Sequence, residues 1–502
     1  MTLKQRKITF VLVCVCIIAI VALLYPLTTQ LLKVFHDHDY RYSYFPSRDV
    51  VKAPIEQGES AQAVPILMYH GVLVRGELGI NTTREQFISH MEMLKKEGYQ
   101  TISINEYDLY RQGDFVLPAK PIIITFDDGR KDSYYTVDKI FEKLGFKATI
   151  FIASIKANQN DPFFLSWNEL KKIQKNNRWE IEAHGRHSHD VVIADNNGTE
   201  GRYLTSRIYN PINGLESAED FDLRIENDYK DSIDDLYNNL GISAQYYAIP
   251  LSDYGENSSN YSESALLNLE LTKKYFKFAF VQNAADEYGV YETFYNYIDT
   301  NPYSLKRLDV RNISAEDLKY ALEKYAPSKP QGIFPALSEQ DTMTNRIQIQ
   351  HGNLDMSTDG ITIHSTLPST SARVVFGDKG WKNYSVDAVI SRDKARSASL
   401  IMYYLDEDNM VLVNWDQSNI KIIERIDGID KVLFGKNLYK KNDDSMKVSA
   451  TIKDSYLSVN FNGVQLINGQ HIDIPRGAPG FGVWDPEGNS ATLTSFQVTE
   501  SK

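Results

Sequence analysis

The sequence predicts an N-terminal transmembrane helix, an α/β domain built as a (β/α) barrel, and a C-terminal all-β sandwich. Residues 8–27 are apolar and uncharged, residues 63–325 alternate short apolar strands with amphipathic helices, and residues 343–502 hold only short alternating strands. Strands that alternate with helices are typical of a parallel sheet. The repetition of this unit favours a sheet that closes into a barrel.

The first 27 residues are typical of a signal anchor. Residues 1–7, "MTLKQRK", are basic, and residues 8–27, "ITFVLVCVCIIAIVALLYPL", carry no charge. Roughly 20 apolar residues span a bilayer core of about 30 Å. No small-residue cleavage site follows, so we expect an uncleaved anchor. The basic flank stays in the cytoplasm, which predicts a single-pass protein of the cell membrane with the rest of the chain outside the cell.

The composition limits the partners and the covalent chemistry. A net charge of −12 disfavours nucleic acid. Both cysteines, Cys14 and Cys16, lie in the predicted anchor, so the exported parts have no disulfide and depend on core burial. Residues 28–62 show no sustained period and are interpreted as a stem.

Residues 63–325 carry the alternating pattern of the barrel. We expect strands at "PILMY" (65–69), "PIIITF" (121–126), "KATIFIA" (147–153), "WEIEA" (179–183), "QYYAI" (245–249) and "FKFAFV" (276–281). We expect helices at residues 83–99, 133–146, 166–176, 228–241, 265–275 and 314–325. Gly98 and Gly145 are placed to end the first two helices, and Ser314 to cap the last.

Beyond the barrel the pattern changes to all-β. Residues 326–342 begin with the proline-rich "APSKPQGIFP" and are interpreted as a linker. Strands are expected at "YSVDAVISR", "SASLIMYYL", "MVLVNW", "IKIIERI", "MKVSATI", "YLSVNFN" and "ATLTSFQV". Short strands separated by turns predict an antiparallel sandwich over residues 343–502.

Two predicted barrel strands end in residues that bind metals. "PIIITF" runs into Asp127 and Asp128, and "WEIEA" runs into His184 and a loop that carries His187 and His189. In parallel α/β folds, functional groups gather at the carboxyl ends of the strands. An aspartate with two histidines is a catalytic metal pattern, and the second carboxylate is placed to act as a base.

These residues resemble a known family. "ITFDDG" with a downstream histidine pair resembles the polysaccharide deacetylases, the carbohydrate esterases with a NodB-homology domain. "VPILMYHGV", "YYAIPLSDYGEN" and "NPYSLKRLDV" resemble further segments of one branch, so the resemblance covers about residues 63–325. It implies a distorted (β/α) barrel that hydrolyses a sugar acetamide with a divalent metal. Zinc is favoured, and cobalt and nickel are alternatives for imidazole ligands.

The resemblance also implies the metal ligands. Asp128, His184 and one later histidine hold the ion in the family. Most members place three residues between the two histidines, which would put the second ligand at Ser188. The poly-N-acetylglucosamine deacetylases of biofilm systems place four between them, which matches His189. We therefore predict His189 as the ligand, with His187 as the alternative.

The proton-transfer residues follow from the same resemblance. Asp127 is the implied base, and the backbone N–H of Leu251 is the implied oxyanion donor, although the branch has Tyr-Gly where this chain has Leu251-Ser252. The late histidine that serves as acid in most members is missing here. His70, at the end of the first strand, is our candidate for that acid. We predict that Arg307 fixes the Asp127 carboxylate by a bidentate pair.

Aromatic residues suggest where a glycan binds. Candidates for a groove at the barrel are Tyr203, Arg207 and Tyr209. The sandwich loosely resembles concanavalin-like or laminin-G-like sugar-binding modules in "GDKGWKNYSVDAVI" and "GAPGFGVWDPEGNSATLTSFQV". Its candidates for stacking on sugars are Trp381, Tyr403, Trp415 and Trp484, each of which a buried core position also explains.

The sequence thus predicts a membrane-anchored extracellular deacetylase of poly-N-acetylglucosamine or a related biofilm exopolysaccharide. Peptidoglycan or chitin-type chains are alternative substrates. A non-catalytic glycan-binding protein of the cell surface is the alternative of another class. A glycosidase ranks last, because adjacent carboxylates cannot readily flank a glycosidic bond at a separation of about 5 Å or more. The expected partners are the polysaccharide, the membrane, and proteins of exopolysaccharide synthesis or export.

Overall fold

The computed structural model describes residues 44–51, 58–74, 79–159, 161–256, 258, 260–283, 294–328, 330, 332–334, 347–357, 360–366, 371–437 and 445–501. The chain divides into two compact units, Met1–Glu323 and Lys324–Lys502. The predicted anchor, residues 8–27, lies outside the described residues. Within the described ranges no helix is both long and apolar enough to cross a membrane.

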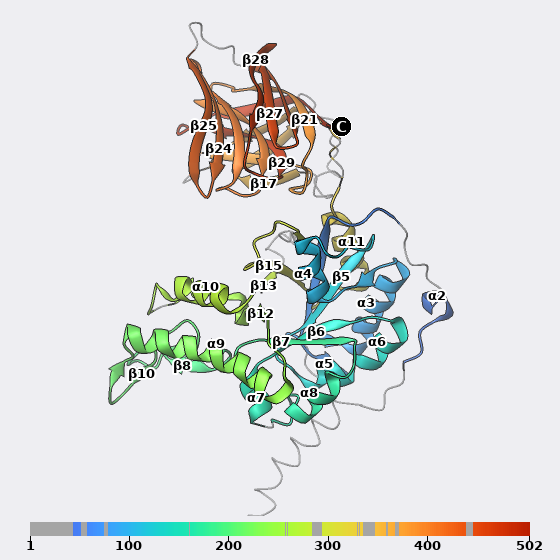
Figure 1. The fold of residues 1–502 in the computed structure, drawn as a ribbon. Coiled ribbons are helices and arrows are strands. Elements are labelled where there is room, and N and C mark those ends of the chain that lie inside the picture. The colour runs from blue at the N-terminus through green and yellow to red at the C-terminus, as the bar shows by residue number, and fades with distance from the viewer. Residues whose placement is uncertain are drawn as a thin grey trace, which may run out of the picture. The chain divides into compact units, whose positions relative to one another are not determined.

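The first unit is a closed parallel barrel of seven strands (Figure 1). Around the barrel the order is β1-β15-β13-β12-β7-β6-β5, and β5 pairs with β1 to close it. The seven strands are β1 (Ala63–Tyr69), β5 (Pro121–Phe126), β6 (Ala148–Ile152), β7 (Trp179–Ala183), β12 (Tyr246–Ala248), β13 (Phe278–Asn283) and β15 (Leu305–Asp309). Outside the barrel, β4 (Gln100–Thr101) extends β5 and β14 (Tyr295–Tyr297) runs antiparallel to β1. The predicted parallel barrel is confirmed.

Helices connect most of the barrel strands. The connecting helices are α3 (Arg84–Lys96), α4 (Ile104–Gln112), α5 (Lys131–Tyr135), α6 (Asp138–Leu144), α7 (Ser154–Asn158), α8 (Trp167–Ile173), α9 (Ala218–Leu240), the 3₁₀ turn η1 (Pro250–Ser252) and α10 (Ser264–Tyr275). In addition, α2 (Arg48–Val51) precedes β1 and α11 (Ala315–Tyr325) follows β15. Local sequence sets their ends: Ser103 and Glu106 form a capping box at α4, and Ser217 caps α9. The helix expected over residues 133–146 is two short helices, and α9 begins ten residues before its expected start.

Residues 190–217 form two small hairpins between the histidine loop and α9. The hairpins are β8 (Val191–Ile193) with β9 (Glu200–Arg202) and β10 (Tyr209–Asn210) with β11 (Gly214–Leu215). Figure 1 shows α9 and α10 running side by side away from the barrel, with β8 and β10 near α9. A further pair, β2 (Val72–Leu73) and β3 (Thr82–Thr83), follows β1.

The second unit is built from two antiparallel sheets, which confirms the predicted all-β fold. Sheet one contains β18 (Asn353–Ser357), β19 (Gly360–His364), β30 (Ser490–Glu500), β21 (Tyr384–Ser391), β26 (Ser445–Lys453), β27 (Tyr456–Phe461), β28 (Val464–His471) and β16 (Gly332–Phe334). Sheet two contains β17 (Ile347–His351), β20 (Ser371–Phe376), β29 (Ala478–Trp484), β22 (Ser397–Tyr404), β23 (Met410–Trp415), β24 (Asn419–Ile426) and β25 (Ile429–Asn437). Strand β16 lies within the stretch expected to be a linker and pairs with β30.

The core of the second unit lies between its two sheets. Inward residues of both sheets, such as Val386 of β21 and Phe481 of β29, belong to one buried cluster. Trp381, Tyr403 and Trp415 are also part of this cluster and are at most 4% exposed. The buried core position that the sequence also suggested for these three is therefore confirmed, and they are not available to stack on a sugar. Trp484 is 40% exposed and remains a candidate.

Candidate metal centre and active site

The two carboxylates lie in the tight turn after β5. All six residues of this strand are buried, as expected for "PIIITF" in a barrel wall. The N–H of Asp127 still donates to the carbonyl of Tyr69 on β1, at 3.0 Å. Asp128 then adopts a left-handed backbone with φ 72°, which aspartate tolerates better than most residues. The turn leaves Asp127 buried and Asp128 partly exposed at the end of the strand.

His184 begins the histidine loop directly after β7. Its N–H donates to Ile152 of β6 at 3.0 Å, so the sheet pairing continues up to this residue. Its ring Nδ1 lies 2.7 Å from the carbonyl oxygen of Ala248 on β12. A carbonyl only accepts, so Nδ1 carries the proton and Nε2 keeps a free lone pair. The barrel wall thus orients His184 as a ligand.

Ser188 orients the second histidine. Its hydroxyl donates to the carbonyl oxygen of His184 at 2.7 Å. The Ser188 hydroxyl oxygen also lies 3.3 Å from Nδ1 of His189. Because the only hydroxyl proton is already used, Ser188 accepts from the His189 Nδ1–H, which leaves Nε2 of His189 free. Gly185 makes the loop possible: its φ is +75°, and a Cβ there would lie 2.7 Å from Ser188 Cβ.

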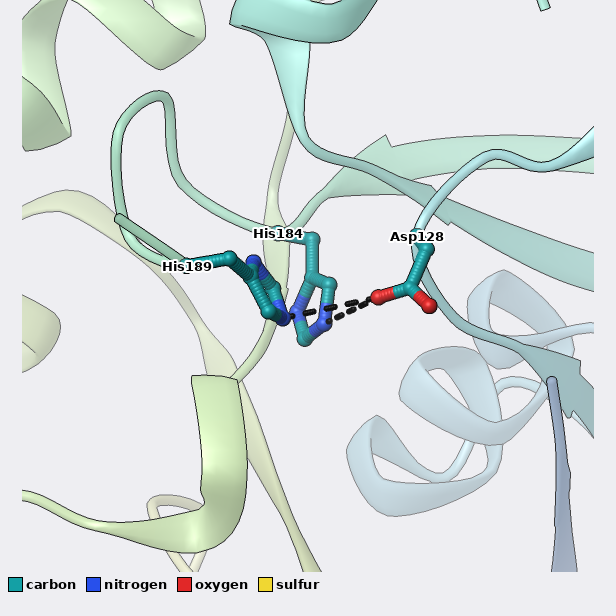
Figure 2. A group of neighbouring side chains, drawn as sticks. All are labelled: Asp128, His184 and His189. Carbon is teal, nitrogen blue, oxygen red and sulfur yellow. Dashed lines mark ion pairs between the residues drawn. The ribbon is translucent and has the colours of Figure 1, made fainter. Parts of the chain in front are cut away.

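Asp128, His184 and His189 converge on one point (Figure 2). Asp128 Oδ1 lies 3.6 Å from His184 Nε2 and 3.4 Å from His189 Nε2, and one ligand atom of each residue lies within 4.8 Å of the others. Ligands about 2.1 Å from a tetrahedral ion lie about 3.4 Å apart. Burial, with a smaller effect of the nearby His184, lowers the pKa of His189 to about 4, so its ring is neutral at pH 7. The donor set fits a divalent ion.

His187 points away from this group. Its Nδ1 lies 2.9 Å from Asp190 Oδ2, and its ring packs against Tyr203 with centroids 5.4 Å apart. The Arg224 guanidinium lies 4.5 Å from the centroid of the Tyr203 ring. The arrangement favours His189 over His187 as the ligand. The proposed place of Tyr203 in a glycan groove stays a prediction.

Asp228 of α9 fixes the histidine loop, and the sequence analysis missed it. Its buried carboxylate accepts from the N–H of Arg186 at 3.1 Å and from the N–H of His187 at 2.6 Å. Burial raises the pKa of Asp228, although these two backbone bonds oppose the shift. In the sequence it is one of many acidic residues in a long helix, and no local signal marks it.

Asp127 and Arg307 form the expected bidentate pair. Arg307 Nη1 lies 2.6 Å from Oδ1 and Nη2 lies 2.8 Å from Oδ2, with both residues at most 3% exposed. Burial alone would raise the pKa of Asp127, but the charges of Arg307 and His184 hold it well below its usual range. Asp127 Oδ2 lies 4.0 Å from His184 Nε2, so the carboxylate borders the candidate metal site without joining it.

His70 and Leu251 lie at the ends of β1 and β12. His70 is partly exposed, and its charge acts on the pKa values of both Asp127 and His189. Leu251 lies in η1 with φ 58°, and its side chain is exposed. A bulky residue rarely adopts this backbone, and such strain collects at functional turns. The roles of both residues stay predictions.

The part of the chain that carries the candidate metal site is similar to known proteins. Residues 116–269, which include Asp128, His184 and His189, match the family described as polysaccharide deacetylase. A putative polysaccharide deacetylase YxkH of Bacillus subtilis (strain 168) is 37% identical over 94 residues, which cover 19% of this chain and 33% of that protein.

Two further proteins are similar to parts of this chain. The poly-beta-1,6-N-acetyl-D-glucosamine N-deacetylase of Escherichia coli (strain K12) is 23% identical over 236 residues, covering 43% of this chain and 34% of that protein. The chain therefore spans about a third of the length of both curated relatives. A solved de-N-acetylase of Aggregatibacter actinomycetemcomitans aligns with a TM-score of 0.44 at 18% identity, over 52% of this chain and 100% of that one. Residues 116–269, which carry the candidate metal site, are therefore similar to the polysaccharide deacetylase family.

Proposed function

We propose that this chain is a metal-dependent hydrolase that removes acetyl groups from an extracellular N-acetylated polysaccharide, with poly-N-acetylglucosamine as the favoured substrate. The convergence of Asp128, His184 and His189 beside the buried Asp127 is the observation that carries the proposal. The name of the E. coli relative supports the choice of polymer.

The three converging residues would hold the ion. When bound, a divalent metal supplies Lewis-acid activation of the acetamide carbonyl and of the attacking water. Asp128 provides the one carboxylate ligand, and the two histidines present free Nε2 lone pairs because their Nδ1 atoms are hydrogen-bonded. Such partners around a metal ligand fix its tautomer and its orientation.

Asp127 takes the proton of the attacking water in this proposal. Both of its oxygens accept from Arg307, but a carboxylate oxygen has two lone pairs, so each can accept one more proton donor. Because Arg307 and His184 lower its pKa, the carboxylate is ionised across the physiological range. It is therefore always in the form that accepts a proton.

Two neighbouring residues at the rim would stabilise the oxyanion and protonate the leaving amine. The N–H of Leu251 would donate to the oxyanion as the tetrahedral intermediate forms. His70 would donate a proton to the leaving amine, whose release yields a free amino sugar and acetate. Both residues follow barrel strands whose carboxyl ends share this rim, β12 and β1.

The uncharged residues 8–27 support a place on the cell membrane with the barrel outside. There the protein would meet the secreted polymer and the proteins of its synthesis or export. Protease added to intact cells should release the barrel if this topology is correct, and full protection would refute it.

The proposed function is tested with purified full-length chain loaded with zinc, cobalt or nickel. The substrates are soluble oligomers of β-1,6-N-acetylglucosamine, chitin oligosaccharides and peptidoglycan fragments, and the free amines and acetate are measured. Metal-dependent release of both products from the β-1,6 oligomers supports the proposal. Release only from chitin or peptidoglycan fragments would change the substrate, and no release with any metal would favour a non-catalytic glycan-binding protein.

A further inference from the structure

A second polar group lies at the same end of the barrel as the pair of Asp127 and Arg307. On β15, Leu305 belongs to the apolar cluster inside the barrel. Because side chains alternate along a strand, Arg307 and Asp309 face the barrel interior as well. Asp309 follows Arg307 by two residues, a spacing of about 7 Å, toward the carboxyl end of the strand. The metal ligands also follow the carboxyl ends of their strands, so Asp309 shares the rim with them.

Gln282 of the neighbouring strand β13 connects Asp309 to the turn η1. Gln282 pairs with Arg307 in the register of the sheet, so its side chain faces the same interior. Its Nε2 donates to Asp309 Oδ2 at 2.9 Å, and its backbone N–H donates to Ser252 Oγ. Because Ser252 follows Leu251 in η1, only Gln282 separates Asp309 from the turn that carries the implied oxyanion donor.

Asp309 also fixes the side chain of Arg311. Its Oδ1 accepts from the backbone N–H of Arg311 at 3.0 Å, and its Oδ2 accepts from Nε of Arg311 at 2.5 Å. Arg311 Nη2 pairs with the same Oδ2. Asp309 is 6% exposed, and both of its oxygens already accept from the protein itself. It therefore orients its partners and does not meet a ligand.

Arg311 is the member of this group that can reach a ligand. Its side chain is 34% exposed, and no acceptor within the described residues bonds to its Nη1. Nη1 carries two N–H donors, and a guanidinium keeps its charge and has no acceptor. Because Asp309 already holds the guanidinium, a ligand need not order this long side chain when it binds.

We propose that Arg311 selects polymer in which the sugar next to the reacting one is still N-acetylated. The acetamide of that neighbour offers a carbonyl oxygen, which accepts from the Nη1 donors of Arg311. Deacetylation of the neighbour leaves an ammonium group instead, which has only donors and the same charge as the guanidinium. The inference rests on the proposed function and narrows its substrate class to stretches of adjacent acetylated sugars.

This preference opposes the charge of the whole chain. A net charge of −12 attracts a polymer that bears free amines more strongly than a neutral one. A preference for the neutral neighbour must therefore come from a local contact, and the long-range field of the protein cannot produce it.

The test measures the binding of two β-1,6-linked trimers by titration calorimetry, with metal-loaded full chain that carries Asp127→Asn to slow turnover. One trimer is N-acetylated on all three sugars, and the other only on its central sugar, so both offer an acetamide to the metal site. The first should bind at least tenfold more tightly, as expected for a hydrogen bond to a charged group. Adding Arg311→Ala should reduce the preference to about threefold or less, the factor that three acetamides in place of one provide. Arg311→Lys keeps the charge without the planar fork of donors and should be intermediate.

Arg178→Ala is the matched control. The Arg178 side chain is 29% exposed and pairs with Asp138 at 3.1 Å, but it precedes β7 and so lies at the opposite end of the barrel. This variant should keep the full preference, and near-ultraviolet circular dichroism should show every variant folded.

Three outcomes would overturn the inference: a parent chain without the preference, an unchanged preference in Arg311→Ala, or an equal loss in Arg178→Ala. Weaker binding of both trimers to Arg311→Ala by one common factor would also overturn it, because Arg311 would then contact a hydroxyl group common to both. Free-amine release by the unaltered chain from the fully acetylated trimer is measured in parallel. A binding preference without release would count against the proposed function alone.

Discussion

The Asp127–Arg307 pair at the barrel rim and the core of the second unit are both buried, but they are built from different side chains. At the rim, Arg307 contacts the Asp127 carboxylate at 2.6 and 2.8 Å. The cluster between the two sheets of the second unit is instead made of apolar and aromatic side chains such as Val386 and Phe481. Groups that transfer protons must be fixed in direction before the substrate arrives, whereas an apolar core requires only close packing.

The two regions also differ in the free energy that a substitution should cost. A buried charge is tolerated only when it is paired, and removing its partner is strongly destabilising. Substitutions at the rim should therefore change metal binding, turnover or folding by large factors. Changes confined to the second unit should leave turnover of short substrates unchanged. The following predictions test this contrast in order of decreasing effect.

The largest effect is expected for the metal ligands. His189→Ala should lose the metal and the activity together, because it removes one of three converging donors. His187→Ala is the matched control in the same loop and should keep both, since His187 pairs with Asp190 instead. Metal content by mass spectrometry and free-amine release check both variants. The reverse outcome would show that the ligand is His187.

Asp127→Asn should keep the metal and lose turnover. Proton transfer by a positioned side chain typically contributes about 100- to 10,000-fold, so kcat should fall by a factor in that range. Asp127 Oδ2 lies 4.0 Å from His184 Nε2, and Asp127 is not one of the three converging ligands. The metal content of the variant should therefore stay near one ion per chain. A rate near that of the unaltered chain would contradict its role as base.

Arg307→Ala should act on folding as well as on activity. It leaves Asp127 as a buried, unpaired carboxylate, and such a loss costs about 3–5 kcal/mol. Denaturant unfolding should show the loss. The double variant Arg307→Ala with Asp127→Asn should recover part of it, because the unpaired charge is gone. A double variant no more stable than Arg307→Ala would mean that the pair is not the cause.

A smaller effect is expected at Ser188. Ser188→Ala removes the acceptor for His189 Nδ1–H, so Nε2 is no longer held in its ligand form. Loss of such a partner typically weakens metal affinity about 10- to 100-fold. Metal titration of the apo protein should show this shift, and Ser188→Thr, which keeps the hydroxyl, should recover part of it. Equal affinity in all three proteins would refute the role.

The sequence predicted the parallel barrel because its strands are apolar, short and regularly spaced by helices. The strand β15 was not expected, since "LKRLD" is too polar to read as a buried strand. Arg307 and Asp309 are buried there because they have polar partners: Arg307 pairs with Asp127, and Asp309 accepts from Gln282. A sequence pattern shows which segments are hydrophobic, but it does not show which charged side chains will form ion pairs or hydrogen bonds in the folded protein.

The candidate metal site could likewise be predicted only in part. Asp128, His184 and His189 follow buried strands, so their convergence could be expected from strand ends alone. Asp228 could not be found, because it bonds to the backbone N–H groups of residues that lie 42 and 41 positions earlier in the chain. For Trp415 the sequence left a buried position and a sugar-stacking position both open, since an aromatic in an alternating strand can face either side, and the structure shows it buried.

The smallest effect concerns the second unit. Every proposed metal and proton-transfer residue lies in the first unit, so a chain that ends after Ala326 should fold and deacetylate short soluble oligomers within about twofold of the full rate. If the second unit binds the polymer, the rate of the truncated chain on long polymer should fall by about tenfold or more, because a second binding site on the same chain raises the local concentration of substrate. If the truncated chain loses its rate on short and long substrates alike, the two units act together in catalysis, and the division between a catalytic first unit and an accessory second unit would not hold.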